Sequence, residues 1–87
     1  MLIAATDRKE LTLNGLKMLR KRAGLSQQQL ADASGFDLSG VSRAERGHRT
    51  VTLGKASMLL DVLHAHLGGD RVALAHELVR GEEDAAV

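Results

Sequence analysis

The basic side chains of this sequence are concentrated in the middle of the chain. Residues 17–55 hold eight lysines and arginines against three acidic residues, whereas residues 61–87 hold two basic and six acidic residues. The net charge of +1 therefore conceals a basic middle and an acidic C-terminal part. A cluster of guanidinium and ammonium groups beside an acidic segment is suited to binding a polyanion through the basic part alone. The alternative is that these charges form ordinary solvated helix faces.

The histidines could suggest a metal site, but their spacing does not favour one. His64 and His66 are two residues apart on an expected helix end, so their rings point in different directions, and His76 is distant in sequence. No cysteine is present and no carboxylate completes a ligand set at a spacing typical of zinc. We therefore expect surface histidines, no bound metal and no cofactor.

Enzymatic and single-strand-binding chemistry also lack their usual residues. There is no nucleophile motif and no glycine-rich phosphate loop, so we expect no catalytic residues and no enzyme activity. Phe36 is the sole aromatic residue, which is too few for a platform that stacks RNA or single-stranded bases. The absence of cysteine, of a secretory signal and of a run of about 18 apolar residues favours a cytoplasmic protein that does not enter a membrane.

The elements that must position the basic residues have helical periodicity, and no segment alternates long enough to predict a strand. A first helix is expected over residues 12–23, with Leu13, Leu16 and Leu19 on one face and Gly24 after its end. Arg20 lies within that apolar face. A guanidinium in such a position needs an acidic partner, because its desolvation is otherwise costly.

Two short helices follow the first one. Ser26 and Gln29 have the spacing of a capping box, which predicts a helix of about eight residues that ends at Gly35. Asp37 is the expected N-cap of a second helix over residues 38–45.

The second short helix also provides the missing acid. Val41 and Ala44 are expected to point inward, with Glu45 beside them. We therefore predict a structural ion pair between Arg20 and Glu45.

Two further helices complete an all-α domain. The first, over residues 52–67, is expected to bury Leu53, Ala56, Leu59, Leu60 and Leu63. The next begins after Asp70, runs to about Arg80 and ends at Gly81, and an acidic tail of residues 82–87 follows.

The stretch LKMLRKRAGLSQQQLADASGFDLSGVSRAERGHRTVTL resembles the helix-turn-helix family of phage repressors, the Cro and Xre-like proteins. The resemblance rests on Leu16, Leu19 and Arg20, on the GLSQ motif with Leu30, Ala31 and Gly35, and on VSRAERG with Arg49. It implies a compact five-helix bundle, a lambda-repressor-like DNA-binding domain, whose third helix enters the major groove of double-stranded DNA. The family's charge pair between its first and third helices falls on Arg20 and Glu45.

Under that resemblance, the outward side chains of the third helix would meet base edges. The residues expected there are Leu38, Ser39, Gly40, Ser42 and Arg43. Arg43 is the strongest candidate, because a guanidinium can bond O6 and N7 of guanine together. Ser39 could bond either kind of base edge. Leu38 could contact a thymine methyl group or simply cover the core.

Other polar residues on either side of that helix would hold the DNA backbone. Gln27 matches the family's phosphate-contacting position at the start of the second helix, where backbone N–H groups also favour an anion. The full set expected to touch phosphates is Gln27, Gln28, Arg46, His48, Arg49 and Thr50.

Gly40 departs from the family, which usually has threonine, serine or a larger residue there. Glycine costs about 1 kcal/mol of helix propensity relative to alanine. Two explanations remain open: the glycine allows the helix to approach the duplex closely, or it is neutral.

The fifth helix carries an apolar face wider than one partner surface requires. A core helix and a dimer seam are both consistent with this face, and we favour a homodimer seam formed by Val72, Leu74, Ala75, Leu78 and Val79. The expected organisation is an N-terminal arm over residues 1–11, the helix-turn-helix domain over 12–67, the dimerising fifth helix over 68–81 and the tail over 82–87.

These inferences predict a sequence-specific transcriptional regulator, most simply a repressor, that binds a two-fold operator as a dimer. The alternative is an antitoxin whose main role is to bind a protein toxin through its acidic tail, with DNA binding as autoregulation.

Overall fold

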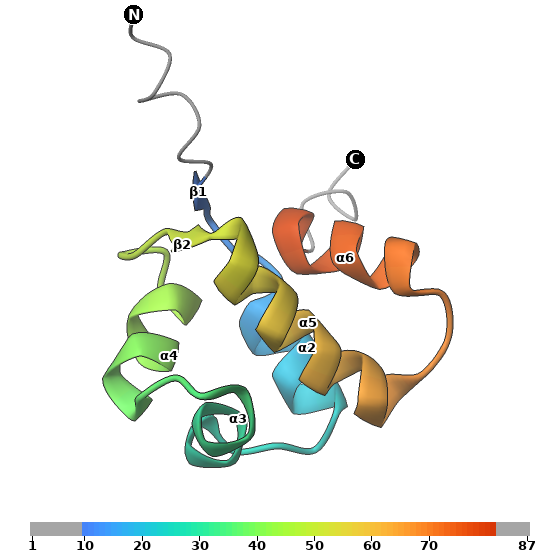
Figure 1. Cartoon of the computed structure of the whole chain (residues 1–87), viewed down its shortest axis with the longest axis horizontal. Helices are drawn as coiled ribbons and strands as arrows, with labels where there is room; N and C mark the ends of the chain where they lie inside the picture. The colour runs from blue at the N-terminus through green and yellow to red at the C-terminus, as the bar shows by residue number, and fades with distance from the viewer. Residues whose placement is uncertain (1–9, 82–87) are drawn as a thin grey trace, which may run out of the picture.

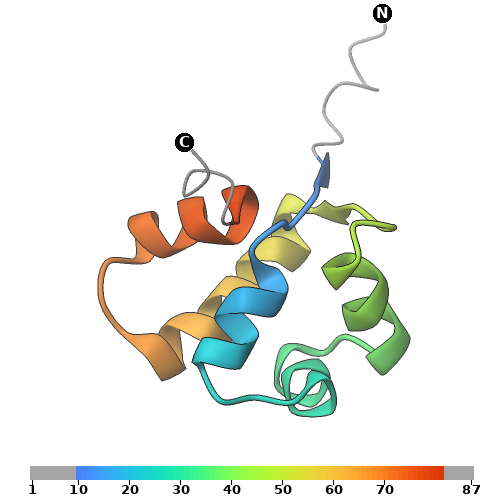
Figure 2. The ribbon, with the colours of Figure 1, turned by 180° about the vertical axis from the view of Figure 1, so that it is seen from behind.

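The computed structural model describes residues 10–81, which form five helices and a small two-stranded sheet. The elements in chain order are β1 (Glu10–Leu11), α2 (Leu16–Arg22), α3 (Gln27–Ser34), α4 (Leu38–Glu45), β2 (Val51–Thr52), α5 (Leu53–Leu67) and α6 (Arg71–Arg80). Figures 1 and 2 show α2 and α5 side by side at the centre, with α3 and α4 on one side of them and α6 on the other. The expected five-helix fold is confirmed for the described residues.

The core consists of small and aliphatic side chains, as a chain with one aromatic residue requires. Its buried members are Leu13, Leu16, Leu19, Leu30, Ala31, Val41, Ala44, Val51, Ala56, Leu59, Leu60, Leu63, Leu74 and Leu78. Every described helix contributes to this set, so the position of each helix depends on the others. Phe36 packs against the edge of the core and is only partly buried.

The expectation that Leu53 is buried is wrong: its side chain is 60% exposed. Leu53 is the first residue of α5, directly after the N-cap Thr52, and α5 turns its buried face to the core only from Ala56 onward. The helical period places Leu53 near that face, but Leu53 borders an open groove between α5 and α6 and is not covered there.

The helix starts follow the local capping chemistry. The Ser26 hydroxyl accepts a bond from the Gln29 N–H, and the Gln29 side chain accepts one from the Ser26 N–H, so the capping box of α3 is complete. The Asp37 carboxylate caps α4 by accepting the Gly40 N–H at 3.0 Å. These side chains satisfy N–H groups that a short helix otherwise leaves unpaired.

The helix expected over residues 12–23 begins only at Leu16, and the prediction of no strand is wrong. The backbone N–H groups of Asn14 and Gly15 donate to the carbonyls of Val79 and Leu78 at 3.3 and 2.8 Å, which directs this segment toward α6 before it becomes helical. Ahead of it, β1 pairs antiparallel with β2, with Leu11 opposite Val51. Two-residue strands are too short to show an alternating pattern in the sequence.

The N-terminal arm predicted over residues 1–11 is therefore folded in part, since Glu10 and Leu11 belong to the sheet. Residues 1–9 and the predicted tail, residues 82–87, lie outside the described residues.

The wide apolar face of α6 is shared between the core and the surface. Leu74 and Leu78, expected in a dimer seam, are 5% and 2% exposed and pack within the chain itself. Val72 is 63% exposed, and Ala75 and Val79 are half-buried. Of the five residues expected at a dimer seam, Val72, Ala75 and Val79 therefore retain the most surface that a partner could contact, and the seam itself stays a prediction.

Gly15 allows the start of α2 to approach the end of α6. A Cβ atom on Gly15 would lie 2.0 Å from the Glu77 carbonyl oxygen and 3.0 Å from Cα of Gly81. Both neighbours are backbone atoms, so they cannot move aside as the end of a flexible side chain could. The junction of α2 and α6 therefore requires glycine.

We expect Gly15→Ala to reduce the free energy of unfolding by about 1 to 3 kcal/mol or more, because it overpacks this junction. Gly54→Ala in α5 is the matched control, since a Cβ there would have no neighbour within 4 Å. The control should stabilise by up to about 1 kcal/mol through helix propensity. Urea denaturation of both variants measures the difference, and equal midpoints would show that the junction tolerates a side chain.

Candidate nucleic-acid interface

A buried ion pair fixes α4 against α2. Nε of Arg20 donates to Oε2 of Glu45 at 2.5 Å, and Nη2 donates to Oε1 at 3.2 Å, so the contact is bidentate. The side chains are 10% and 2% exposed. Nη1 of Arg20 also donates to the Leu25 carbonyl at 2.9 Å, which ties in the loop before α3. The pair thus joins α2, the entry to α3 and the end of α4.

The turn between α3 and α4 is set by Gly35. Its φ of +84° lies in the left-handed region, where glycine avoids the strain that a Cβ would cause. The chain then passes Phe36 and enters α4 at the Asp37 cap. The two helices of eight residues each are consequently packed together at a tight turn.

The outer face of α4 is polar and accessible. Leu38, Ser39 and Arg43 are exposed, and the Arg43 side chain has no hydrogen bond or ion pair to another residue in the described part of the chain. Val41 and Ala44 lie on the opposite face, fully buried. The helix is therefore held from behind by the core and the ion pair while its front remains open.

The arrangement of two short helices, a tight turn and an open second helix agrees with the comparison to known families. The profile of a helix-turn-helix family, of the Xre and Cro-like type, matches residues 16–68, which is more than half of the chain. The chain belongs to this helix-turn-helix family. No curated protein matches the sequence.

Membership defines the kind of function. The helix-turn-helix family consists of DNA-binding transcription regulators that are generally not enzymes, and the chain has that kind of function. Its helix-turn-helix is formed by α3 and α4. None of the described helices is long and apolar enough to cross a membrane.

Gln27, at the start of the helix-turn-helix, has an internal partner in the structure. Its Nε2 donates to Oε1 of Glu45 at 2.9 Å, so this amide adds a third group to the buried pair. Gln28 is exposed and donates to the Asp32 carboxylate at 2.9 Å. The two glutamines expected to touch phosphates thus differ: one supports the ion pair, and the other lies on the surface.

The side chains of Ser42 and Arg46 are joined, since Nη2 of Arg46 donates to Oγ of Ser42 at 3.1 Å. This bond orients the Arg46 guanidinium along the exposed side of α4. Ser42 is half-buried. Of the residues expected to contact bases, Ser42 is therefore the one already engaged by a neighbouring cation.

Gly40 does not belong to the exposed face of α4, which corrects the expectation that it contacts bases. It is buried, and its Cα faces the side chains of Asp37, Arg49 and Phe36. The helical period places Gly40 only about 40° from the buried Ala44, and the side chains of Asp37, Arg49 and Phe36 cover it.

The loop after α4 contains the remaining residues expected at phosphates. His48 is exposed, and its backbone N–H donates to the Arg43 carbonyl at 3.0 Å. The Thr50 hydroxyl is bonded to the Glu10 carboxylate, so β1 engages it. Arg49 is half-buried, and its side chain has no hydrogen bond or ion pair to any described residue.

Lys55 was not singled out from the sequence, yet the structure places it beside this loop. Its Nζ lies 5.8 Å from the centre of the Phe36 ring, which is a cation–π contact. Lys55 and Arg49 both line a hollow of about 260 Å³ next to Phe36 and Asp37. The sequence did contain a signal for this position: Lys55 lies three residues after the Thr52 cap and therefore falls in the first turn of α5, next to the loop.

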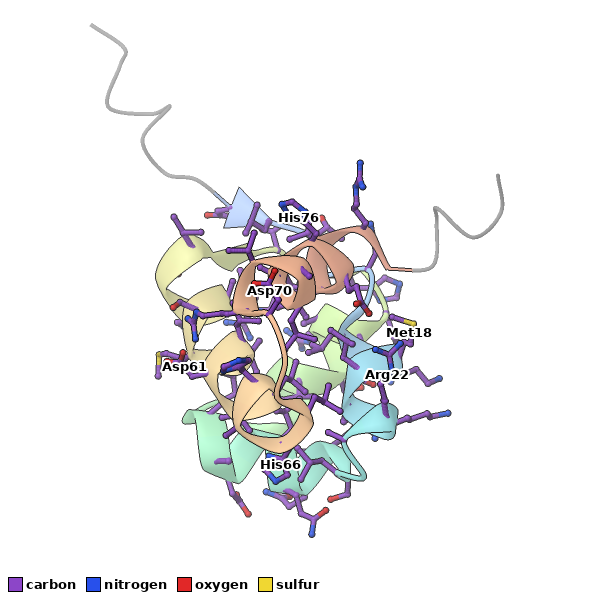
Figure 3. All side chains as sticks on the ribbon, turned by 90° about the vertical axis from the view of Figure 1, so that its right-hand side faces the viewer. Met18, Arg22, Asp61, His66, Asp70 and His76 are labelled. Atoms are coloured by element: carbon purple, nitrogen blue, oxygen red, sulfur yellow. The ribbon has the colours of Figure 1, made fainter. Side chains whose placement is uncertain are left out.

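The acidic residues described in the C-terminal part lie on another side of the molecule. Figure 3 looks onto α6 and the end of α5, with Asp61, Asp70 and His76 labelled. Asp61 pairs with Arg71, and Glu77 pairs with Arg22 at 3.0 Å.

Within residues 10–81 no three potential metal ligands come together.

Arg20→Met should destabilise the fold by about 3 to 5 kcal/mol, because Glu45 would be left buried without its cation. Replacing both residues, Arg20→Met with Glu45→Leu, should recover much of that loss, although Gln27 and the Leu25 carbonyl lose partners too. Denaturation in guanidinium chloride measures the free energy of unfolding of the single and double variants. If both unfold at the same denaturant concentration, the pair does not hold α4 in the way described.

Proposed function

We propose that this helix-turn-helix protein is a sequence-specific transcriptional repressor that binds a two-fold operator in double-stranded DNA as a homodimer. The observation that carries the proposal is the open face of α4, where Arg43, which has no partner among residues 10–81, stands beside small hydroxyl groups on a helix fixed from behind. Occupying the operator is the simplest means by which such a domain regulates a gene. We propose the cytoplasm as its compartment.

Base recognition in this proposal centres on Arg43. Its guanidinium is exposed and not engaged by another described residue, so both of its terminal nitrogens can bond O6 and N7 of one guanine. Ser39 lies one turn earlier and bonds the Asp37 carboxylate only loosely, at 3.4 Å, which leaves its hydroxyl available to a base. Leu38 is exposed and can contact a thymine methyl group.

In this proposal, the contacts to the DNA backbone come from both sides of α4. Arg49 and Lys55 line one hollow beside α4, Arg46 and His48 are exposed at and after its end, and Gln28 lies at the start of α3. Such contacts contribute affinity for any duplex and fix the register of the reading helix. Thr50 would contribute only if it exchanged its bond to Glu10 for one to a phosphate.

Dimerisation would supply a second reading helix, since one helix-turn-helix unit covers only a few base pairs. The structure offers an apolar groove of about 260 Å³ between α5 and α6. It is lined by Leu11, Leu53, Ala56, Ser57, Leu60, Ala75, Leu78 and Val79. Of the apolar lining residues, Leu53 is the most open, with its side chain 60% exposed, and Val72 on α6 is 63% exposed. We propose this groove and its rim as the dimer seam.

The test of sequence reading compares Arg43→Ala with Arg49→Ala on operator and scrambled duplexes at one salt concentration. Arg43→Ala should lose about 1 to 3 kcal/mol of binding free energy on the operator and much less on the scrambled duplex. Arg49→Ala should weaken both duplexes by a similar factor. Equal losses on both duplexes for Arg43→Ala would assign it to a phosphate and remove the basis for base recognition.

The test of the seam is Leu53→Glu. An acid in the first turn of α5 suits the helix dipole, and Leu53 is largely exposed, so the fold should be retained. A charge buried in the seam should nevertheless cost a few kcal/mol of association free energy and yield a monomer by light scattering. Ala73→Glu is the control, because Ala73 is exposed on the side of α6 away from the groove. A Leu53→Glu protein that remains dimeric would place the interface elsewhere.

A further inference from the structure

Gly40 leaves room for another side chain within the first turn of α4. A Cβ atom at this position would lie 2.8 Å from Nη1 of Arg49, 2.5 Å from Oδ1 of Asp37 and 3.5 Å from Cδ2 of Phe36. Non-bonded heavy atoms are most favourable at about 3.5 to 4.0 Å, so the first two contacts would be too close. The guanidinium of Arg49 can lie where it does because residue 40 has no side chain.

The backbone does not require a glycine at this position. Gly40 lies within α4 and is not among the described glycines with positive φ. Inside a helix, glycine is less favourable than alanine, so α4 is weakened by it. Close packing by Arg49 therefore gives a reason for Gly40, which the helix itself disfavours. This reason differs from both explanations that the sequence left open, close approach to the duplex and neutrality.

Arg49 is held in place but keeps its hydrogen-bonding capacity. It is half-buried against Gly40, Phe36 and Asp37, which together we call the Arg49 seat. No hydrogen bond or ion pair joins its side chain to another described residue, and no buried nitrogen or oxygen of a described side chain lacks a partner. None of the Arg49 guanidinium nitrogens is therefore fully buried, so a ligand can reach them. Lys55 lies over the same Phe36 ring and adds a second positive charge.

We propose that Gly40 is a positioning residue: it opens the seat that orders the Arg49 guanidinium beside the reading helix before DNA is bound. A planar guanidinium that is already oriented loses less side-chain freedom when it bonds a phosphate. This inference rests on the proposed function, because it assigns the group that Arg49 addresses to the DNA backbone.

The direct test is a double-mutant cycle of Gly40→Ala and Arg49→Ala, titrated against one duplex at several salt concentrations. Arg49→Ala removes a charged hydrogen bond and should weaken binding about tenfold. It should also lower the log–log salt slope by about 0.9. Gly40→Ala keeps the Arg49 charge, so it should leave the salt slope nearly unchanged and weaken binding about two- to tenfold, the loss expected when one side chain must be ordered on binding. The double variant should bind within about twofold of Arg49→Ala. Losses that multiply, or a Gly40→Ala variant that binds as tightly as the unaltered protein, would overturn the proposal.

A second measurement works without DNA. The ¹H–¹⁵N heteronuclear NOE of the Arg49 Nε–H in the free protein should exceed that of the exposed Arg43, and Gly40→Ala should reduce it to the Arg43 value. Equal values for the two arginines in the unaltered protein would show that no seat exists. If the unaltered protein binds no duplex while the NOE difference is present, the proposed function fails and the seat remains.

The cap at Asp37 needs a control, because Gly40→Ala also crowds its carboxylate. In an Asp37→Ala background that crowding is absent, and Arg49 is the remaining neighbour closer than 3 Å. Adding Gly40→Ala to Asp37→Ala should still lower the Arg49 NOE and weaken duplex binding. If it changes neither, Gly40 acts through the cap and the proposal is wrong. Circular dichroism verifies that each variant is folded at the titration temperature.

Discussion

The position of α4, the proposed reading helix, depends on one interaction, the ion pair between Arg20 and Glu45. Helix α4 has only eight residues, and a helix of that length is not stable alone in water. Val41 and Ala44 attach it to the core through small side chains, while Glu45 receives two bonds from Arg20 and a third from Gln27. Because charge so deeply buried is tolerated only with its partners in place, the orientation of α4 is coupled to that of α2 and α3. The open face of α4 can be polar because this attachment does not use it.

Glycine performs two different tasks around this framework. At Gly15 it lets the backbone of α2 approach that of α6, which closes the bundle on the side away from α3 and α4. At Gly40 it admits the side chain of Arg49 next to the reading helix. The first task concerns stability and the second concerns the proposed contact with DNA. Both rest on space rather than on backbone freedom, so neither can be inferred from a turn pattern.

Local signals in the sequence were enough to predict most helices. The starts of α3, α4, α5 and α6 follow from capping residues, and Arg20 in an apolar face was a reliable pointer to Glu45 because the alternative is too costly. What could not be predicted depends on contacts between distant segments. The late start of α2 results from bonds to α6, and the short strands form only because Glu10 and Thr52 meet. The helical period likewise could not divide the wide apolar face of α6 into a buried half with Leu74 and Leu78 and an accessible half.

We propose that the exposed face of α4 reads a DNA sequence, twice in each complex. Selection of bound sites from a pool of random duplexes tests this directly, because the pool contains every candidate operator. We expect an enriched consensus of two inverted half-sites, each containing a guanine for Arg43, with centres separated by about one helical turn or a multiple of it. Recovery of duplexes with no shared sequence, despite tight binding, would contradict sequence reading by α4. A single enriched half-site would contradict the dimer.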